Sequence, residues 1–502
     1  MISQLLKVIE EGSDILVLGA GLLRLCRARL VQLYDAEVDR DIWFEREALR
    51  NRCEEFFREV DDEQMYPEER AELGEIALSW SQKLPEIAIV RTIAEALDAV
   101  LGSRFLPMFL GREVTLKPGD PFPTPHRDWR RVAAAQDDDS AAVEEHLDAL
   151  THLRLAGDWA REVRVTVVGN WLRWHAIPHL SSGDRLACAT PNESLNELAM
   201  ERAVTARLPD IAAGEPGNAD PGDRPSAGSD PSASNSLPGR PVFFNARFGT
   251  DQEQQSRLCI ALLNAAREHN CRVVAFPEFS ITLSARQAVK DWLDGQDVVD
   301  MIIAGSCHRP GASGGQGDAE QAGAPTTRSA EPTWYSEAVV FLRGTQKPLV
   351  HRKFSPLVVP DPQSGTGPSG LRRHEHVATG GPAFTAHLSP YWTTIVLCSR
   401  DALLAPVPKV LLDLHANLVL VPALGFEMEA FEKLAGDIAT SLQGIVLIAN
   451  ACVAPDAESA RPPLIIGLPV QSDAVIAEVA PPRALVIATI GSLTKSPSIV
   501  DS

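Results

Sequence analysis

The hydrophobic positions of residues 1 to about 105 recur with a helical period. The segment from Pro85 to Gly102 shows this best, because Pro85 suits a first helical position and Gly102 suits a stop. Its apolar residues share one face of the predicted helix: Ile89, Ile93, Leu97, Val100 and Leu101. Residues 5–33 and 43–60 are also periodic. A further helical pattern spans residues 141–155, and a short β-branched run at 164–171 predicts a strand.

A change of composition follows this region. Residues 212–236 contain no Val, Ile, Leu or Phe, so they cannot bury enough apolar surface to offset the entropy of ordering them. We therefore predict a mainly helical domain over 1–210, a flexible linker over 211–239 and a second domain over 240–502. A similar stretch at 311–331 has strand-like flanks, which favours a long surface insertion within the second domain.

The second domain alternates short β-branched runs with helical patterns, which predicts an α/β layer architecture. The runs that predict strands are 272–276, 301–304, 338–342, 393–397, 417–421 and 445–449. One helix is predicted to start at Thr250, which has capping-box spacing to Glu253, and another spans 426–443.

Composition and charge narrow the class of protein. Hydrophobic residues make up 45% and charged residues 23% of the 502 residues, as in soluble globular proteins. The formal net charge of -20 argues against a nucleic-acid partner or a basic membrane surface. No apolar run reaches the length of a membrane-spanning helix, and Met1 leads into an acidic pattern unlike a secretory signal. The 8 cysteines form no CxxC pair, so we expect a reduced, cytoplasmic protein.

Three chemically capable side chains follow predicted strands of the second domain. Glu278 ends an apolar run, Lys353 closes a His-Arg-Lys triplet, and Cys398 ends another apolar run. Taken singly, each has an ordinary interpretation: a helix-capping carboxylate, a surface lysine and a small buried hydrophobe. Their occurrence together, in this order within one α/β pattern, favours a catalytic site.

In these residues the chain resembles the nitrilase superfamily, the carbon–nitrogen hydrolases. Val274 to Glu278 looks like the family's apolar-Pro-Glu motif, His351 to Lys353 like its Tyr/His-Arg-Lys motif, and Cys398 like its nucleophile. The resemblance covers roughly residues 240–495. It implies a four-layer α-β-β-α sandwich, preceded here by the helical domain. It also implies a homodimer or larger oligomer and a site without metal or organic cofactor.

The resemblance also implies residue roles. Cys398 is the nucleophile, Glu278 the general base and Lys353 the oxyanion stabiliser, with the backbone N–H of Ser399 beside it. Glu375 matches the family's second glutamate. Ala423, Leu424 and Phe426 correspond to the substrate-binding loop. The alternative for Glu375 is a metal site, because it lies between His374 and His376.

One position departs from the family pattern. The acid that usually follows the nucleophile by two places is found one place later, at Asp401, and Arg400 stands in between. Arg400 either lowers the thiol pKa and selects an anionic substrate or points to solvent.

We therefore expect an amidase-type hydrolase that cleaves a small-molecule, non-peptide C–N bond through a thioester. A catalytically silent binding or regulatory module of the same fold and a soluble N-acyltransferase are the alternatives. The helical domain has no recognisable family, and a protein partner is an open role for it.

Overall fold

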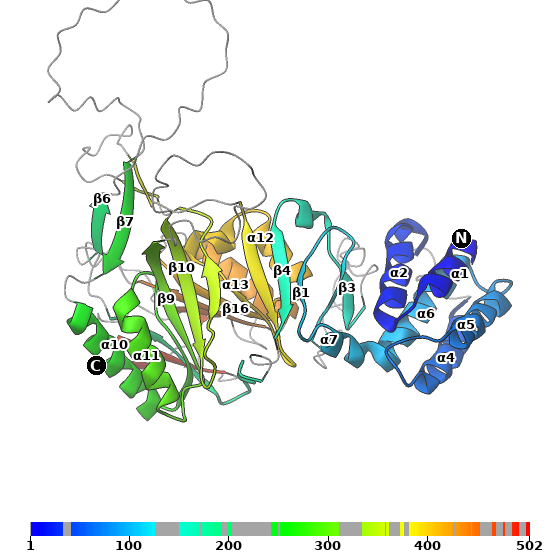
Figure 1. Ribbon diagram of the computed structural model, residues 1–502, viewed down its shortest axis with the longest axis horizontal. Coiled ribbons are helices and arrows are strands. Elements are labelled where there is room, and N and C mark those ends of the chain that lie inside the picture. Colours follow the sequence, from blue (N-terminus) through cyan, green and yellow to red (C-terminus); the bar gives the residue numbers. More distant parts are fainter. Residues whose placement is uncertain are drawn as a thin grey trace, which may run out of the picture.

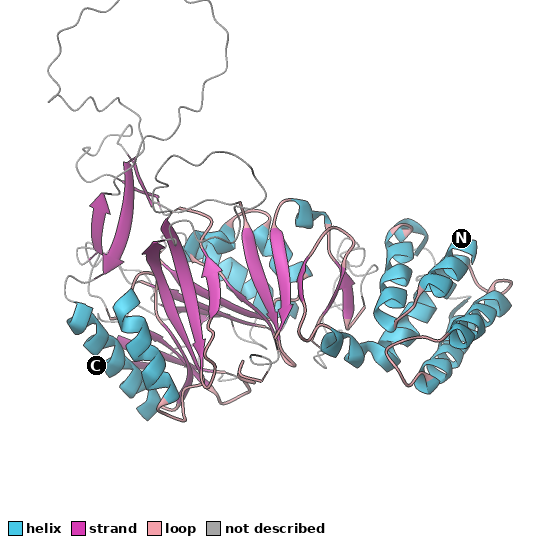
Figure 2. Ribbon diagram, viewed as in Figure 1, coloured by secondary structure: helices cyan, strands magenta, loops and turns pink. Residues whose placement is uncertain are grey.

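The computed structural model describes residues 2–33, 42–125, 150–170, 173, 175–191, 198–202, 242–248, 252–310, 334–356, 358–360, 372–375, 381–424, 428–442, 444–451, 464–467, 475–476, 484–490 and 498–501. Figures 1 and 2 show a bundle of helices at one end of the long axis and a body of sheets flanked by helices at the other.

The N-terminal part is helical, as the periodicity predicts. Its helices are α1 (Ile2–Glu11), α2 (Ile15–Arg27), α4 (Trp43–Glu59), α5 (Pro67–Trp80) and α6 (Glu86–Leu101), followed by the short η2 (Gly102–Arg104) and α7 (Phe105–Met108). The Asp14 side chain caps α2 by accepting a hydrogen bond of 2.7 Å from the Val17 N–H. Gly102 follows the last residue of α6, as the sequence predicts, whereas Pro85 is the N-cap of the helix and not its first residue.

Two large sheets form the centre of the rest of the molecule. Among the described residues the first has eight strands, in the order β1 (Glu113–Thr115), β4 (Arg164–Gly169), β14 (Ala383–Leu388), β15 (Thr393–Val396), β16 (Leu418–Ala423), β17 (Ile445–Asn450), β18 (Leu464–Gly467) and β19 (Val475–Ile476). The second has seven, in the order β11 (Leu349–Arg352), β10 (Trp334–Leu342), β9 (Met301–Pro310), β8 (Cys271–Ala275), β5 (Arg185–Ala189), β20 (Ala484–Thr489) and β21 (Ser498–Asp501).

The two sheets face each other across an apolar layer. Val396, Leu420 and Leu447 of the eight-stranded sheet share one buried cluster with residues of the seven-stranded sheet such as Ile303 and Val340. The alternate residues of the same strands point outward, because side chains on a strand alternate between faces. The mixed α/β class predicted from the sequence is thus confirmed.

Helices cover the outer face of each sheet. On the seven-stranded sheet α10 (Gln252–Glu268) and α11 (Leu283–Asp294) bury their apolar faces in a cluster with the outward residues of β8 and β9. On the eight-stranded sheet α12 (Val407–Asp413) and α13 (Met428–Leu442) do the same with β16 and β17. Figure 1 shows these two helix pairs on different sides of the strands.

Two smaller sheets complete the description. A four-stranded sheet has the order β12 (Val358–Pro360), β13 (Arg372–Glu375), β7 (Val242–Phe248) and β6 (Leu198–Arg202), and β2 (Pro121–Pro123) pairs with β3 (Leu153–Leu155). The 3-10 turns η4 (Asp158–Arg161) and η6 (Ser399–Leu403) follow β3 and β15.

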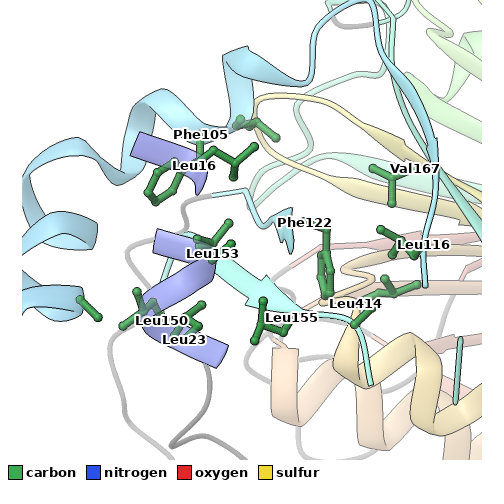
Figure 3. Close-up of a cluster of buried hydrophobic side chains, with 14 of the residues drawn as sticks. Leu16, Leu23, Phe105, Leu116, Phe122, Leu150, Leu153, Leu155, Val167 and Leu414 are labelled. Carbon is green, nitrogen blue, oxygen red and sulfur yellow. The ribbon is translucent and has the colours of Figure 1, made fainter. Parts of the chain in front are cut away.

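The helical part is joined to the eight-stranded sheet by a continuous apolar interface. Leu16 and Leu23 of α2 belong to the same buried cluster as Leu153 and Leu155 of β3 and Leu414 after α12 (Figure 3). The Arg27 guanidinium adds a polar tie by donating a hydrogen bond of 2.9 Å to the Ala156 carbonyl.

The domain boundary predicted at residues 211–239 is wrong. β1 and β4 lie in the eight-stranded sheet, where β4 pairs in parallel with β14, and β5 lies inside the seven-stranded sheet between β8 and β20. The α/β body therefore takes in strands from residue 113 onward, because pairing with distant strands overrides the local change of composition. The segment 211–239 itself lies outside the described residues.

The helix predicted over 141–155 is also wrong at its end, where residues 153–155 form strand β3. Residues 141–149 lie outside the described part. In the described part of the chain, no helix combines the length and the apolar character needed to cross a bilayer.

Candidate active site

Three strand ends bring the predicted catalytic residues together. Glu278 follows β8 and Lys353 follows β11 in one sheet, whereas Cys398 follows β15 in the other. The Glu278 N–H donates to the Ala423 carbonyl at the end of β16, 3.3 Å away, so the two sheets are tied at this edge. Glu278, Lys353 and Cys398 are all buried, at 0%, 3% and 0% exposure.

The backbone around Glu278 requires a glycine on the neighbouring strand. Gly305 in β9 has a φ of +66°, and a Cβ atom there would come within 2.2 Å of the Pro277 carbonyl oxygen. Phe279, on the other side of Glu278, also has a positive φ, of 63°, and its N–H donates to the Ser306 carbonyl at 2.9 Å. Gly305 thus lets the turn that carries Glu278 lie directly against β9.

Gly305→Ala is expected to lower the free energy of unfolding by at least about 2 kcal/mol, because the methyl group clashes and the left-handed backbone is strained. Urea unfolding followed by circular dichroism measures the change. Gly436→Ala in α13 is the matched control, since its Cβ would meet no atom within 4 Å and alanine favours a helix. Equal stability of the two variants would contradict the role given to Gly305.

Lys353 bridges two carboxylates. Its Nζ lies 2.5 Å from Glu278 Oε1 and 2.6 Å from Glu375 Oε2, and all three side chains are at most 1% exposed. Glu375 comes from β13 of the four-stranded sheet, so this cluster joins two sheets, and Cys398 after β15 brings in the third. The second glutamate predicted from the sequence therefore joins the other residues in space.

The two glutamates differ in their hydrogen bonds. Glu375 uses both oxygens, because its Oε1 lies 2.8 Å from His308 Nε2. Glu278 Oε2 is buried and has no hydrogen-bond partner in the described part of the molecule. A buried acceptor without a partner is costly and is commonly retained for chemistry.

The pKa values of the two glutamates diverge accordingly. Burial raises the pKa of Glu278 to about 7 against the lowering effect of the Lys353 charge, and the Glu375 charge adds to the rise. Burial also acts to raise the pKa of Glu375, but the Lys353 charge and the contact with His308 lower it to about 2. Burial alone lowers the pKa of Lys353, yet the charges of Glu278 and Glu375 raise it above its usual value. Near neutral pH, Glu278 is therefore the carboxyl that can gain and release a proton.

The Cys398 thiol is held in its protonated form. Burial raises its pKa well above the usual value and the Glu278 charge adds to this, whereas Lys353 and the Ser306 side chain act in the opposite direction. A thiol of this kind needs a base at the moment of attack. The residue after it, Ser399, is the first residue of η6 and has a φ of 48°.

Asp401 holds the nucleophile turn against the lysine turn. Its buried carboxylate accepts hydrogen bonds from His351 Nε2 at 2.8 Å, from the Phe354 N–H at 3.2 Å, and from the N–H (2.8 Å) and hydroxyl of Ser355. His351 and Phe354 lie on either side of Lys353 in sequence. The displaced acid noted in the sequence thus connects the segment of Lys353 to that of Cys398.

Two buried histidines, His308 and His351, join the predicted residues in the site. His308 on β9 contacts Glu375, and the polar alternation of Ser306 and His308 within an apolar strand is the signal that marks them. His351 belongs to the motif that predicts Lys353, but no local pattern in the sequence predicts its pairing with Asp401. Both histidines are buried.

The residues predicted to bind the substrate differ in their exposure to solvent. Arg400 is exposed, in contrast to the buried Cys398 and Ser399. Ala423 and Leu424 are buried, and the Ala423 carbonyl anchors Glu278. Phe426 lies outside the described residues.

Among the described residues, no group of three or more His, Cys, Asp or Glu side chains is placed to hold a metal ion. The His374 side chain and residue His376 lie outside that description. Glu375 is engaged by Lys353 and His308.

Comparisons with known proteins give two kinds of result. No protein-family model and no curated protein matches the chain. Among solved structures, the chain is similar to an amidase from Nesterenkonia sp., with 13% identity, a TM-score of 0.35, and coverage of 62% of this chain and 92% of that one. It is also similar to Nit3 from Saccharomyces cerevisiae, a member of branch 10 of the nitrilase superfamily, with 11% identity, a TM-score of 0.36, and coverage of 62% and 91%.

Proposed function

We propose that the chain is a hydrolase of the nitrilase type that cleaves an amide-type C–N bond in a small molecule through a Cys398 thioester. The observation that carries this proposal is the arrangement of Glu278. One of its oxygens is held by Lys353, and the other is buried without a hydrogen-bond partner among the described residues. A carboxylate so placed, with a pKa of about 7, is suited to general-base catalysis at neutral pH.

In the first step, Glu278 Oε2 takes the thiol proton as Cys398 Sγ attacks the carbonyl carbon of the amide. The carbonyl π electrons move to the oxygen, and the Lys353 ammonium and the Ser399 N–H stabilise that oxyanion. The C–N bond then breaks, the nitrogen takes the proton from Glu278, and ammonia or an amine leaves.

In the second step, water attacks the thioester carbon and gives a proton to Glu278. The C–S bond breaks, the Cys398 thiolate takes the proton from Glu278, and a carboxylic acid is released. Lys353 stabilises the second oxyanion as it did the first. Glu375, ionised and hydrogen-bonded on both oxygens, keeps Lys353 charged and in place.

The packing of the two sheets and their outer helices supports a nitrilase-type α-β-β-α sandwich for the body of the molecule. We place the protein in the cytoplasm, as the spacing of its cysteines without a CxxC pair favours. We further propose a homodimer or larger oligomer, which light scattering of the full chain tests.

The test combines turnover with labelling. Ammonia release from a panel of short aliphatic amides is measured for the wild type, Cys398→Ala and Cys307→Ala. The same proteins and Glu278→Gln are then treated with limiting 2-chloroacetamide at pH values from about 5 to about 9. This thiol reagent carries an amide group, so it can bind where an amide substrate binds. Intact-protein mass spectrometry measures how much of each protein is labelled. We expect turnover and labelling in the wild type and Cys307→Ala and neither in Cys398→Ala.

The labelling rate should rise with pH through about 7, because Glu278 must lose its proton before it can accept one from the thiol. Glu278→Gln should remove this dependence. Turnover that survives in Cys398→Ala would exclude the thioester mechanism. Acyl-enzyme that forms but is released only to added amines would identify a transferase, and no acylation by any amide would favour a silent binding module.

A further inference from the structure

His308 is a buried histidine in direct contact with the charged cluster. It lies on β9, its side chain is 5% exposed, and its Nε2 is 2.8 Å from Glu375 Oε1. Its ring packs edge-on against Phe279, with ring centroids 5.4 Å apart, and Phe279 directly follows Glu278 in sequence. His308 therefore contacts both segments that carry the two glutamates.

The two glutamates present equivalent groups to Lys353. Each offers one oxygen to the ammonium at nearly the same distance, 2.5 Å for Glu278 and 2.6 Å for Glu375, and each is fully buried. From these contacts alone, either carboxylate could take up a proton. The contact with His308 distinguishes the two glutamates. His308 engages the second oxygen of Glu375, whereas the second oxygen of Glu278 has no hydrogen-bond partner in the described residues.

The direction of the hydrogen bond follows from the acceptor. An ionised carboxylate can only accept, so Nε2 of His308 carries the hydrogen. A hydrogen bond to a charged group is stronger than one between neutral groups, and in a dry site it favours the ionised form of the acceptor. His308 thus stabilises Glu375 as a carboxylate whether the imidazole is neutral or charged.

We propose that His308 is a positioning residue that selects Glu278, rather than Glu375, as the proton acceptor of the site. By donating to Glu375 it keeps that carboxylate ionised and turned toward Lys353, so the proton exchanged during the reaction resides on Glu278. This inference rests on the proposed function for its catalytic meaning. The protonation preference itself is a property of the resting protein.

Removing the His308 donor should change the proton affinity of the two carboxyls in one definite direction. Without His308 the ionised form of Glu375 is less stable, so the pair of carboxyls binds its first proton at higher pH and shares it between the two sites. Such a variant leaves the other charged or titratable groups around the pair in the sequence: Lys353 after β11, Cys398 after β15, and Asp401 in η6 with its partner His351.

The catalytic test compares three variants. His308→Leu removes the donor, His308→Gln keeps a neutral N–H donor, and His387→Leu removes a buried histidine of β14 that no described hydrogen bond or ion pair joins to the cluster. We expect His308→Leu to lower kcat by about 10- to 100-fold, with a smaller change in KM and an acidic limb of the pH–rate profile moved to higher pH. His308→Gln should keep most of the wild-type kcat and the wild-type position of the acidic limb. His387→Leu should behave as the wild type.

A second measurement needs no substrate. Infrared difference spectroscopy across pH follows the C=O band of a buried protonated carboxyl. We expect Glu278→Gln to remove the band that appears near pH 7 in the wild type, and the double variant Glu278→Gln/His308→Leu to regain a band from Glu375. This result would support the inference even if no amide were hydrolysed, so failure of the proposed function can be told from failure of the inference.

Two outcomes would overturn the inference. A band that stays absent in the double variant would show that Glu375 remains ionised without His308. A His308→Gln variant as impaired as His308→Leu, with an unmoved acidic limb in both, would reduce His308 to a packing role.

Discussion

Lys353→Met is expected to abolish measurable amide turnover and to lower the stability of the protein. The substitution keeps the length of the side chain but leaves Glu278 and Glu375 buried without their shared counter-charge. Breaking a buried ion pair by removing one partner costs about 3–5 kcal/mol. Loss of an oxyanion stabiliser alone lowers kcat by about 100- to 1,000-fold, and loss of the orientation of Glu278 adds to it.

The stability loss should depend on pH. The Lys353 charge lowers the pKa of both glutamates. In Lys353→Met the folded-state pKa of Glu278 should therefore rise further above its unfolded value, and burial should raise that of Glu375 above its unfolded value. Carboxyls with a raised pKa contribute stability at low pH and lose it as the pH rises. We therefore expect urea unfolding to show a larger deficit at about pH 8 than at about pH 5.

Lys7→Met is the control for this prediction. Lys7 pairs with Glu11 on α1 at 3.6 Å, but its side chain is 71% exposed, and such surface pairs contribute little. Its variant should match the wild type in turnover and unfolding. A Lys353→Met protein that unfolds like the wild type at both pH values would show that the carboxylates do not depend on the lysine.

The second large effect is expected at Asp401. Asp401→Leu removes the acceptor of four hydrogen bonds and leaves the Phe354 and Ser355 N–H groups buried without it. Each such orphaned group costs about 1–3 kcal/mol, so a total loss of roughly 3–5 kcal/mol is expected. Turnover should fall by at least about 100-fold, because the lysine turn is no longer held against the nucleophile turn.

A graded series tests whether the carboxylate acts through these bonds. Asp401→Asn keeps one acceptor oxygen, so its stability and kcat should lie between those of the wild type and Asp401→Leu. Asp158→Asn, at an 87% exposed position, is the neutral control. An Asp401→Asn variant equal to Asp401→Leu in thermal unfolding and in kcat would contradict a role that depends on hydrogen-bond acceptance.

The sequence predicts those parts of the site that depend on local pattern. An apolar run followed by a polar residue marks a strand end wherever the strand lies in the sheet, and this identifies Glu278 and Cys398. The pairings of His308 with Glu375 and of His351 with Asp401 join residues 67 and 50 positions apart. They depend on strand order and on turns such as the one after Cys398, and no local pattern encodes either.

The error in the domain boundary has the same physical origin. A run such as 164–169 predicts a strand, but its partner, β14, lies more than two hundred positions later, on the far side of the segment without large apolar residues. Composition reports what a segment can bury by itself. It does not report which distant segment completes the sheet.

The placement of β5 bears on how the chain reaches its native state. β5 lies between β8 and β20, so the middle of the seven-stranded sheet combines residues 185–189, 271–275 and 484–489. During synthesis the N-terminal helices can form from neighbouring residues as they emerge, whereas this sheet cannot close until the last of these strands has left the ribosome. Its loop-closure entropy is correspondingly large, and folding of the α/β body is expected to be slow compared with that of the helices.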